Sequence, residues 1–208
     1  GGTLGGVARR TREAMMIVEA AGFDVVIIET VGVGQSETTV AAMVDMFLLL
    51  LAPGGGDELQ GIKRGIMELA DLVIVNKADG DLQQAAGRIA AEYKGALGLL
   101  RPVAPHWSPE VVTCSAIEKT GMDGVWDAVG RHHAAFEAAD ALSPRRSGQS
   151  REWLWSEIEA SLSQAFAADP AVRARLGEIE HQVAAGEMTP TAAAMKLLGA
   201  FRRKDDPS

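Results

Sequence analysis

Four consecutive residues after a short apolar run have the pattern Asn-Lys-x-Asp, namely Asn76, Lys77, Ala78 and Asp79. A carboxylate at Asp79 can accept two hydrogen bonds from guanine, one from the ring N–H and one from the exocyclic amine. Adenine offers no such pair of donors, so it would leave a charged acceptor unpaired. The stem of Lys77 can lie on the base plane, and Asn76 can tie this loop to its neighbours. The pattern predicts a guanine site; the alternative is a strand end followed by surface side chains.

A second loop can complete this base site. Ser115 and Ala116 follow another apolar run, and a helix is expected from Gly121 onward. A Ser-Ala pair at this place can offer a backbone N–H to the guanine carbonyl oxygen. The pair alone carries little weight, but its position after a neighbouring strand favours the guanine interpretation.

A third candidate is Glu29, which ends the apolar run that begins at Asp24 and precedes Gly32 by three positions. A carboxylate at a strand end can hold Mg²⁺ through a water, and a glycine N–H can approach a terminal phosphate without a side chain in the way. A dinucleotide fingerprint does not fit, because Glu37 stands where a third glycine is required. The alternative is a flexible turn between a strand and a helix.

The sequence contains no Gly-x-x-x-x-Gly-Lys-Ser/Thr segment, the P-loop that cradles a β-phosphate. The nearest approach runs from Gly56 to Gly61, but Ile62 replaces the lysine and Asp57 and Glu58 add negative charge. We therefore expect the phosphate-binding half of the site to be missing from these residues, in a chain that is truncated.

Four short, continuous apolar runs are typical of parallel strands covered on both faces. Each run ends in polar or glycine-rich residues, which places the chemistry at the carboxyl edge of a doubly wound, mainly parallel α/β sheet. The runs are Asp24–Glu29, Phe47–Ala52, Asp71–Asn76 and Val111–Ser115. The helices expected between them are Val7–Ala21, Leu59–Leu69, Leu82–Leu97 and Gly121–Ala139.

The composition changes after Leu142. Ser143–Ser150 is rich in linker residues, and no later segment reads as a strand. Three helices are predicted there: Arg151–Ala168, which carries an apolar stripe, and two that begin at Pro170 and Pro190 after N-capping residues. We predict a partial nucleotide-binding domain at 1–142 and a linker with a helical arm at 143–208. The arm would pack on its own domain or on a second subunit.

Composition narrows the possible partners. The chain has 28 acidic and 20 basic residues and a formal net charge of −8, which argues against nucleic-acid binding because no cationic surface is available for phosphates. The longest apolar run, Met46–Ala52, is too short to span a membrane. The single cysteine, Cys114, excludes a disulfide scaffold and fits a reducing compartment, so we predict a cytoplasmic protein.

Three segments together resemble one protein family: Gly2–Ala8, Glu29–Glu37 and Asn76–Asp79. The family is that of P-loop GTPases that act as chaperones of adenosylcobalamin-dependent acyl-CoA mutases, the methylmalonyl-CoA mutase-associated GTPases of the MeaB and ArgK type. The likeness extends into the helical tail, including Met188–Pro190. The family pattern also has an N-terminal extension, a P-loop strand and a first switch, and Gly1 matches a position just after that switch.

The resemblance implies hydrolysis of GTP to GDP with Mg²⁺, coupled to gated cofactor delivery to such a mutase and to its protection. It makes Glu29 the magnesium-side carboxylate, acting through water, and places Gly32 and Gln35 in the second switch. Gln35 is a candidate for positioning the attacking water, although its place in the sequence does not establish that role. The residues implied to bind guanine are Asn76, Lys77, Asp79, Ser115 and Ala116.

The resemblance also implies two surfaces for protein partners. Pro53–Lys63 would be an additional switch loop that communicates with the mutase. Its candidate coupling residues are Asp57, Glu58, Gln60 and Lys63. The helical arm would join two copies of the chain into a homodimer.

Two other interpretations stay open. Because it lacks a P-loop, the chain could be a non-catalytic module that only dimerises and offers a mutase-binding surface. A metal-insertion GTPase is the weaker alternative, because it would need a cluster of Cys and His ligands. His132 and His133 are adjacent on a predicted helix and point about 100° apart, so they do not chelate one ion together. We expect both on a solvated helix face.

Overall fold

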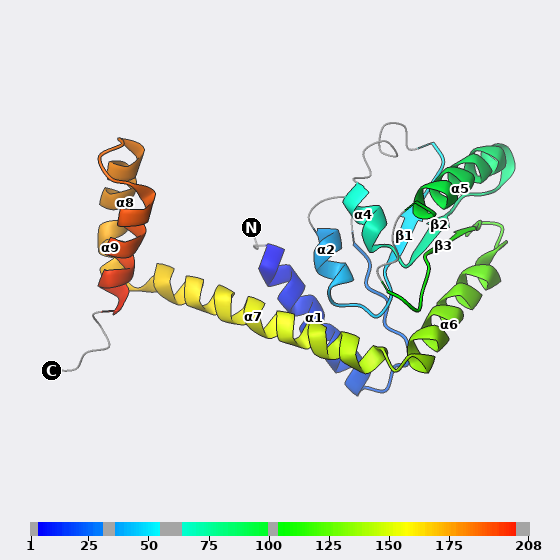
Figure 1. The fold of residues 1–208 in the computed structure, drawn as a ribbon, viewed down its shortest axis with the longest axis horizontal. Coiled ribbons are helices and arrows are strands. Elements are labelled where there is room, and N and C mark those ends of the chain that lie inside the picture. Colours follow the sequence, from blue (N-terminus) through cyan, green and yellow to red (C-terminus); the bar gives the residue numbers. More distant parts are fainter. Residues whose placement is uncertain (1–3, 31–35, 55–63, 100–103, 203–208) are drawn as a thin grey trace. The chain divides into compact units, whose positions relative to one another are not determined.

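The computed structural model describes residues 4–30, 36–54, 64–99 and 104–202 of the 208-residue chain. The chain divides into two compact units, Gly1–Gln149 and Ser150–Ser208. The first unit contains a parallel sheet with helices, and the second unit is helical where it is described (Figure 1). The predicted α/β class is therefore confirmed for the unit that carries the motifs.

Three parallel strands form the sheet, in the order β1-β2-β3. They are β1 (Leu48–Leu51), β2 (Leu72–Val75) and β3 (Glu110–Thr113). The last residues of the three strands stand in register. Because the strands all run in one direction, the loops that follow them emerge at the same edge of the sheet. Three of the four predicted strands are confirmed.

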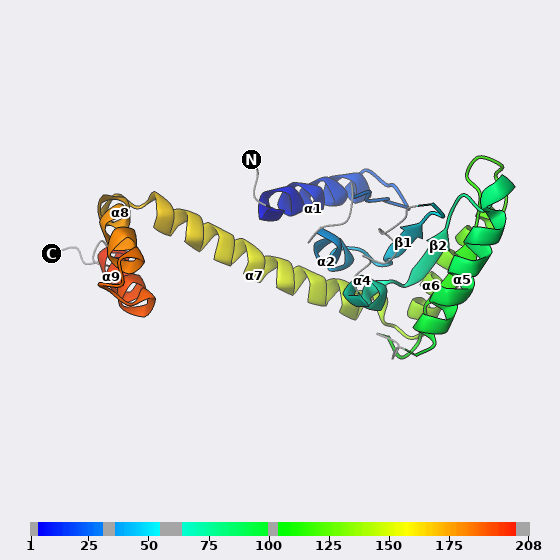
Figure 2. The ribbon, with the colours of Figure 1, turned by 90° about the horizontal axis from the view of Figure 1, so that it is seen from above.

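Helices cover both faces of this sheet. α5 (Gln83–Leu97) and α6 (Met122–Ala138) lie on opposite sides of it (Figures 1 and 2). In the described residues no helix is both long enough and apolar enough to cross a membrane. The 3-10 turn η1 (Gly80–Leu82) precedes α5. The helices of this unit are α1 (Leu4–Ala20), α2 (Ser36–Ala41), α4 (Arg64–Leu69), α5 (Gln83–Leu97) and α6 (Met122–Ala138).

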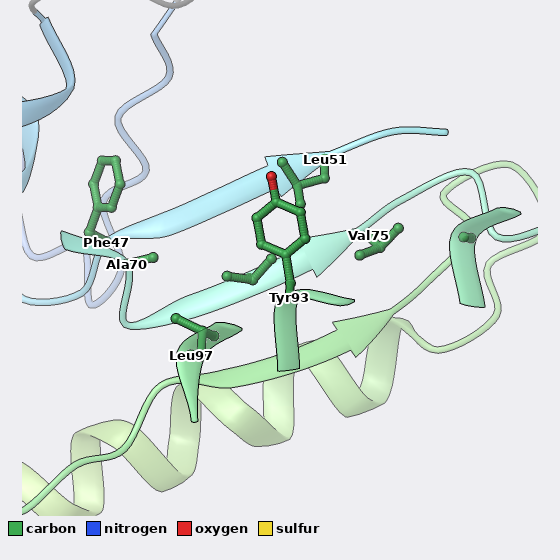
Figure 3. Packing of buried hydrophobic residues seen from close by; sticks show 8 residues of the cluster. Phe47, Leu51, Ala70, Val75, Tyr93 and Leu97 are labelled. Carbon is green, nitrogen blue, oxygen red and sulfur yellow. The ribbon is translucent and has the colours of Figure 1, made fainter. Parts of the chain in front are cut away.

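Four of these helices match predicted ones, and α2 is additional. Part of one predicted helix, residues 59–63, lies outside the described residues. The middle strand β2 shows why the strands read as continuous apolar runs. Val73 and Val75 pack in the cluster that includes Tyr93 of α5 (Figure 3), whereas Leu72 and Ile74 pack on the α6 side. Since both faces of β2 are buried, no position along it favours a polar side chain.

The predicted strand at Asp24–Glu29 is wrong. Residues 25–30 form no strand, and Val25 and Ile27 are 53% and 84% exposed. A strand needs a neighbour to complete its backbone hydrogen bonds, and among the described strands β1 pairs only with β2. A continuous apolar run indicates that a segment tends to be buried, but it does not show that a neighbouring strand is present to pair with it. Glu29 therefore does not end a sheet strand.

The segment Ser143–Ser150, predicted as a linker, is helical instead. It forms the first turns of α7 (Leu142–Ala168). Pro144 is tolerated there because the first turn of a helix requires no backbone donor. Arg146 hydrogen-bonds both carboxylate oxygens of Asp45, with Nε at 2.9 Å from Oδ1. This contact with the segment before β1 stabilises the start of α7, and composition alone does not reveal it.

The second unit contains α8 (Pro170–Ala184) and α9 (Pro190–Arg202), which pack against each other. Asp169 caps α8, since its Oδ1 accepts hydrogen bonds from the N–H groups of Ala171 at 2.8 Å and Val172 at 3.1 Å. The predicted helix starts at Pro170 and Pro190 are thus confirmed. The buried residues between the two helices are Val172, Ile179, Ala193 and Leu197.

Candidate functional site

Two loops lie side by side at the carboxyl edge of the sheet, one after β2 and one after β3. The N–H of Ala78 donates to the carbonyl of Cys114 at 3.0 Å, and the N–H of Cys114 donates to the carbonyl of Val75 at 3.0 Å. These bonds continue the pairing of the two strands beyond their ends. The parallel topology thereby brings residues 76–79 next to residues 114–116.

Asn76 ties the loops together, as the sequence predicts. Its Oδ1 accepts hydrogen bonds from the backbone N–H groups of Ala116 at 3.1 Å and Lys77 at 2.7 Å. Its own N–H donates to the carbonyl of Leu51 at 2.8 Å, so Asn76 connects the ends of all three strands. Lys77 has a φ of +58°, in the left-handed region that residues other than glycine seldom adopt. Such backbone strain is concentrated at functional loops in proteins.

Asp79 is held by a residue of the second loop. Ser115 Oγ donates a hydrogen bond to Asp79 Oδ2 and accepts one from the Glu118 N–H at 3.0 Å. Ser115 is fully buried, whereas Asp79 is half-buried. Asp79 also precedes η1, yet its side chain does not cap that turn. The carboxylate is therefore oriented from across the site, and its Oδ1 accepts no hydrogen bond from the described residues.

The backbone N–H of Ala116, the predicted donor to a guanine carbonyl, has a hydrogen-bond partner within the protein. The Ser-Ala pair predicts a backbone N–H directed to a guanine carbonyl, but the Ala116 N–H donates to Asn76 Oδ1. A base carbonyl oxygen would have to share this donor with Asn76 or replace it. Ala116 is exposed, so a ligand can reach it.

The chemistry of these groups suits a base. One open carboxylate oxygen can accept from ring and amine N–H groups, and the exposed Lys77 can lie beside a flat ring. A triphosphate requires backbone N–H groups and a lysine that cradle its negative charge. The loops after β2 and β3 therefore offer groups suited to a base, and their described residues do not form such a cradle.

The predicted phosphate edge is described only in part. Glu29 is exposed and outside the sheet, and Gly32 and Gln35 lie outside the described residues. The described residues include no group of three or more His, Cys, Asp or Glu side chains that could hold a metal ion. Glu29 alone therefore does not constitute a magnesium site. The predicted coupling residues Asp57, Glu58, Gln60 and Lys63 also lie outside the described residues.

The prediction of two solvated histidines is wrong for His132. This side chain is buried, and its Nε2 lies 3.7 Å from Asp71 Oδ1, whereas His133 is exposed. Asp71 Oδ2 accepts hydrogen bonds from the Phe47 N–H at 2.9 Å and from Arg145 Nη2 at 3.4 Å. These residues lie at the amino ends of the strands, opposite the base loops. The sequence offers little indication that His132 and Asp71 are buried, because the burial of a charged residue depends on partners far along the chain.

The chain is similar to known proteins over nearly its whole length. The family model described as "Methylmalonyl Co-A mutase-associated GTPase MeaB" matches residues 1–171. A relative from Caulobacter vibrioides, described as "Putative GTPase", is 54% identical over 201 residues, covering 97% of this chain and 61% of the relative. The mouse "Methylmalonic aciduria type A homolog, mitochondrial" is 47% identical, covering 98% of this chain and 49% of that protein.

Two further likenesses agree with these. The Escherichia coli "GTPase ArgK" is 51% identical over 158 residues, covering 76% of this chain and 48% of the relative. The solved structure titled "Crystal structure of LAO/AO transport system kinase" has a TM-score of 0.79 and 39% identity, covering 95% of this chain and 63% of that one. The chain thus spans about half to six-tenths of the length of these proteins.

Proposed function

Because the chain belongs to the family of methylmalonyl-CoA mutase-associated GTPases, we propose that the whole protein binds GTP and hydrolyses it to GDP. In this proposal the loops 76–79 and 115–116 bind the guanine base. The observation that carries it is the half-buried carboxylate of Asp79, which Ser115 orients from a neighbouring loop. A carboxylate fixed in this way discriminates guanine from adenine, because only guanine presents two N–H donors, the ring N–H and the exocyclic amine, to it.

The remaining nucleotide contacts follow the family resemblance. Glu29 stays the predicted magnesium-side carboxylate, and Gly32 and Gln35 stay predicted members of the second switch. The phosphate cradle would come from a P-loop that these 208 residues do not contain.

We propose that the partner is an adenosylcobalamin-dependent acyl-CoA mutase in the cytoplasm. GTP hydrolysis would gate delivery of the mutase's cofactor and protect that enzyme. The predicted coupling loop carries Asp57, Glu58, Gln60 and Lys63. Support for this partner comes from the family description, which names methylmalonyl-CoA mutase.

The helical arm would form a homodimer. On α7, the apolar side chains of Leu154, Trp155 and Leu162 are each more than half exposed, which leaves an unpaired apolar surface. A second copy of the arm would cover it. Leu162→Glu should therefore convert a dimer to a monomer in light scattering, and an unchanged mass would contradict this role for α7.

Exchange of Asp79 for Asn tests the base assignment in the whole protein. The variant should bind GTP at least about tenfold more weakly, because hydrogen bonds to a charged group contribute roughly 1.5–3 kcal/mol. It should favour xanthosine triphosphate, whose exocyclic oxygen accepts from the new amide. Asp81→Asn, at an exposed position in η1, is the control and should leave both affinities unchanged. Unaltered GTP binding by Asp79→Asn would refute the assignment.

A second function is favoured by one observation, the absence of a P-loop from the sequence. Residues 1–208 alone would then be a non-catalytic module that dimerises and contacts the mutase. Calorimetric titration of residues 1–208 with Mg-GTP tests whether this chain alone binds the nucleotide or acts only as the non-catalytic module. We expect no binding at micromolar concentrations, since a triphosphate carries about four negative charges that require a cradle.

A further inference from the structure

The loop that joins β3 to α6 is closed by a backbone hydrogen bond between its two ends. The Ser115 N–H donates to the carbonyl of Thr120 at 2.9 Å, and these two residues form an antiparallel bridge. Within the loop, Lys119 has a φ of +57°, and Gly121 follows with a φ of +71°. Two left-handed residues so close together bend the chain back toward the end of β3.

The backbone of Gly121 lies in close contact with the end of β3. A Cβ atom at this position would lie 2.4 Å from the carbonyl oxygen of Thr113 and 3.2 Å from the Cα of Cys114. Real Cβ atoms essentially never come within 3.0 Å of another atom, which excludes the contact with Thr113, and the contact with Cys114 is tighter than most. Both contacts are to backbone, which has no rotamer to change. A side chain at position 121 would therefore displace either the end of β3 or the loop.

Either displacement reaches the base site. Cys114 pairs with the β2 loop through the Ala78 N–H, and Ser115, the next residue, holds Asp79. Because Ser115 is fully buried, its hydroxyl has no room to follow a shifted loop and keep its bond to Asp79. The orientation of the Asp79 carboxylate thus depends on the close approach at Gly121.

We propose that Gly121 is a positioning residue for guanine recognition, acting through Ser115 on Asp79. The inference rests on the proposed binding of guanine at this edge of the sheet. Gly121 does not require contact with the base for this role. It sets base selectivity by allowing the loop to close tightly enough to present Ser115 to the carboxylate.

Two other glycines separate this effect from ordinary consequences of a glycine-to-alanine exchange. Gly186 has a φ of +74° but nothing within 4 Å of a built Cβ, so Gly186→Ala introduces left-handed strain without a clash. Gly124 lies inside α6 and is also open, so Gly124→Ala adds a methyl group near the site without either cost.

The experiment compares GDP with inosine diphosphate in the whole protein, by calorimetry. Inosine lacks the exocyclic amine, so the ratio of the two affinities reports the second hydrogen bond to Asp79. The parent protein should prefer GDP by about tenfold or more. Gly121→Ala should lower this ratio to within about threefold of unity, and Gly186→Ala and Gly124→Ala should keep the parent ratio.

A second measurement needs no nucleotide. In residues 1–208, hydrogen exchange at the Ser115 amide should be faster in Gly121→Ala than in the parent, because the Ser115–Thr120 bond opens. The effect of Gly121→Ala on the affinity ratio should also vanish in a Ser115→Ala background, since both changes remove the same orientation of Asp79.

Two results for Gly121→Ala would contradict its role as a positioning residue. A folded Gly121→Ala variant with the parent affinity ratio would overturn the proposal. A variant that loses the fold of the first unit, by circular dichroism, would also overturn it, because Gly121 would then determine the whole unit and not base recognition. A parent protein that does not distinguish the two nucleotides would refute the proposed guanine site instead, and so the two failures are distinguishable.

Discussion

Removal of the Ser115 hydroxyl is the most direct test of how Asp79 is held. In Ser115→Ala the carboxylate loses the donor that orients it, and the Glu118 N–H loses its acceptor. A hydrogen bond to a charged group contributes roughly 1.5–3 kcal/mol. Asp79 is half-buried, and Glu118 is exposed, so water replaces part of both interactions. We therefore expect the lower end of that range, about 1.5–2 kcal/mol, which corresponds to roughly 10- to 30-fold weaker GDP binding.

Calorimetric titration of the whole protein with GDP measures this loss. Ser161→Ala, at an exposed position on α7, is the matched control and should bind GDP as the parent does. The thermal midpoint of each variant should be recorded, so that affinities are compared only below the unfolding transition. If Ser115→Ala binds GDP within about twofold of the parent while Asp79→Asn binds it poorly, Ser115 does not orient the carboxylate and the reasoning is refuted.

Three further predictions concern stability of residues 1–208. Asp71→Ala should lower the free energy of unfolding by about 2 kcal/mol in urea titrations, because it leaves the buried Phe47 N–H and the half-buried Arg145 without their acceptor, whereas Asp71→Asn should cost less because it keeps an oxygen for Phe47. The hydrogen bonds from Arg146 lower the pKa of Asp45 below its ordinary value, so this pair stabilises the fold above about pH 4 and is lost as the pH falls through the folded-state pKa. The difference in thermal midpoint between the parent and Arg146→Ala should accordingly shrink from pH 7 to pH 3, and a constant difference would contradict the assigned ion pair. Asp169→Ala should cost about 1–2 kcal/mol by removing the cap of α8, and an unchanged urea midpoint would show that the two N–H groups find other partners.

Local patterns sufficed for most of the elements. The run Leu72–Val75 is apolar on both faces, and such a run has few alternatives to a buried parallel strand. Pro170 and Pro190 marked helix starts, because proline fits the first helical position and little else in a helix. A continuous apolar run also led to the prediction of a strand at Asp24–Glu29, and that prediction is wrong because none of the described strands pairs with this segment.

The start of α7 could not be predicted for a related reason. Its residues have the composition of a linker, and its helical state is stabilised by Arg146 reaching Asp45, 101 positions away. His132 likewise has no local feature that marks it as buried, yet it lies against Asp71. Interactions between such distant residues have no periodicity for a sequence window to detect.

The sequence by itself determined which residues are candidates for guanine recognition: an Asn-Lys-x-Asp loop after one strand and a Ser-Ala pair after another. Residue type and spacing carry that information, because the chemistry of a carboxylate or an amide is the same wherever the chain places it. Only the tertiary structure decided that Ser115 orients Asp79, that Asn76 occupies the Ala116 N–H, and that position 121 has no space for a Cβ. These contacts join loops that the parallel strands bring to one edge of the sheet, and distances between them are set by packing of the whole unit, to which every strand and helix contributes.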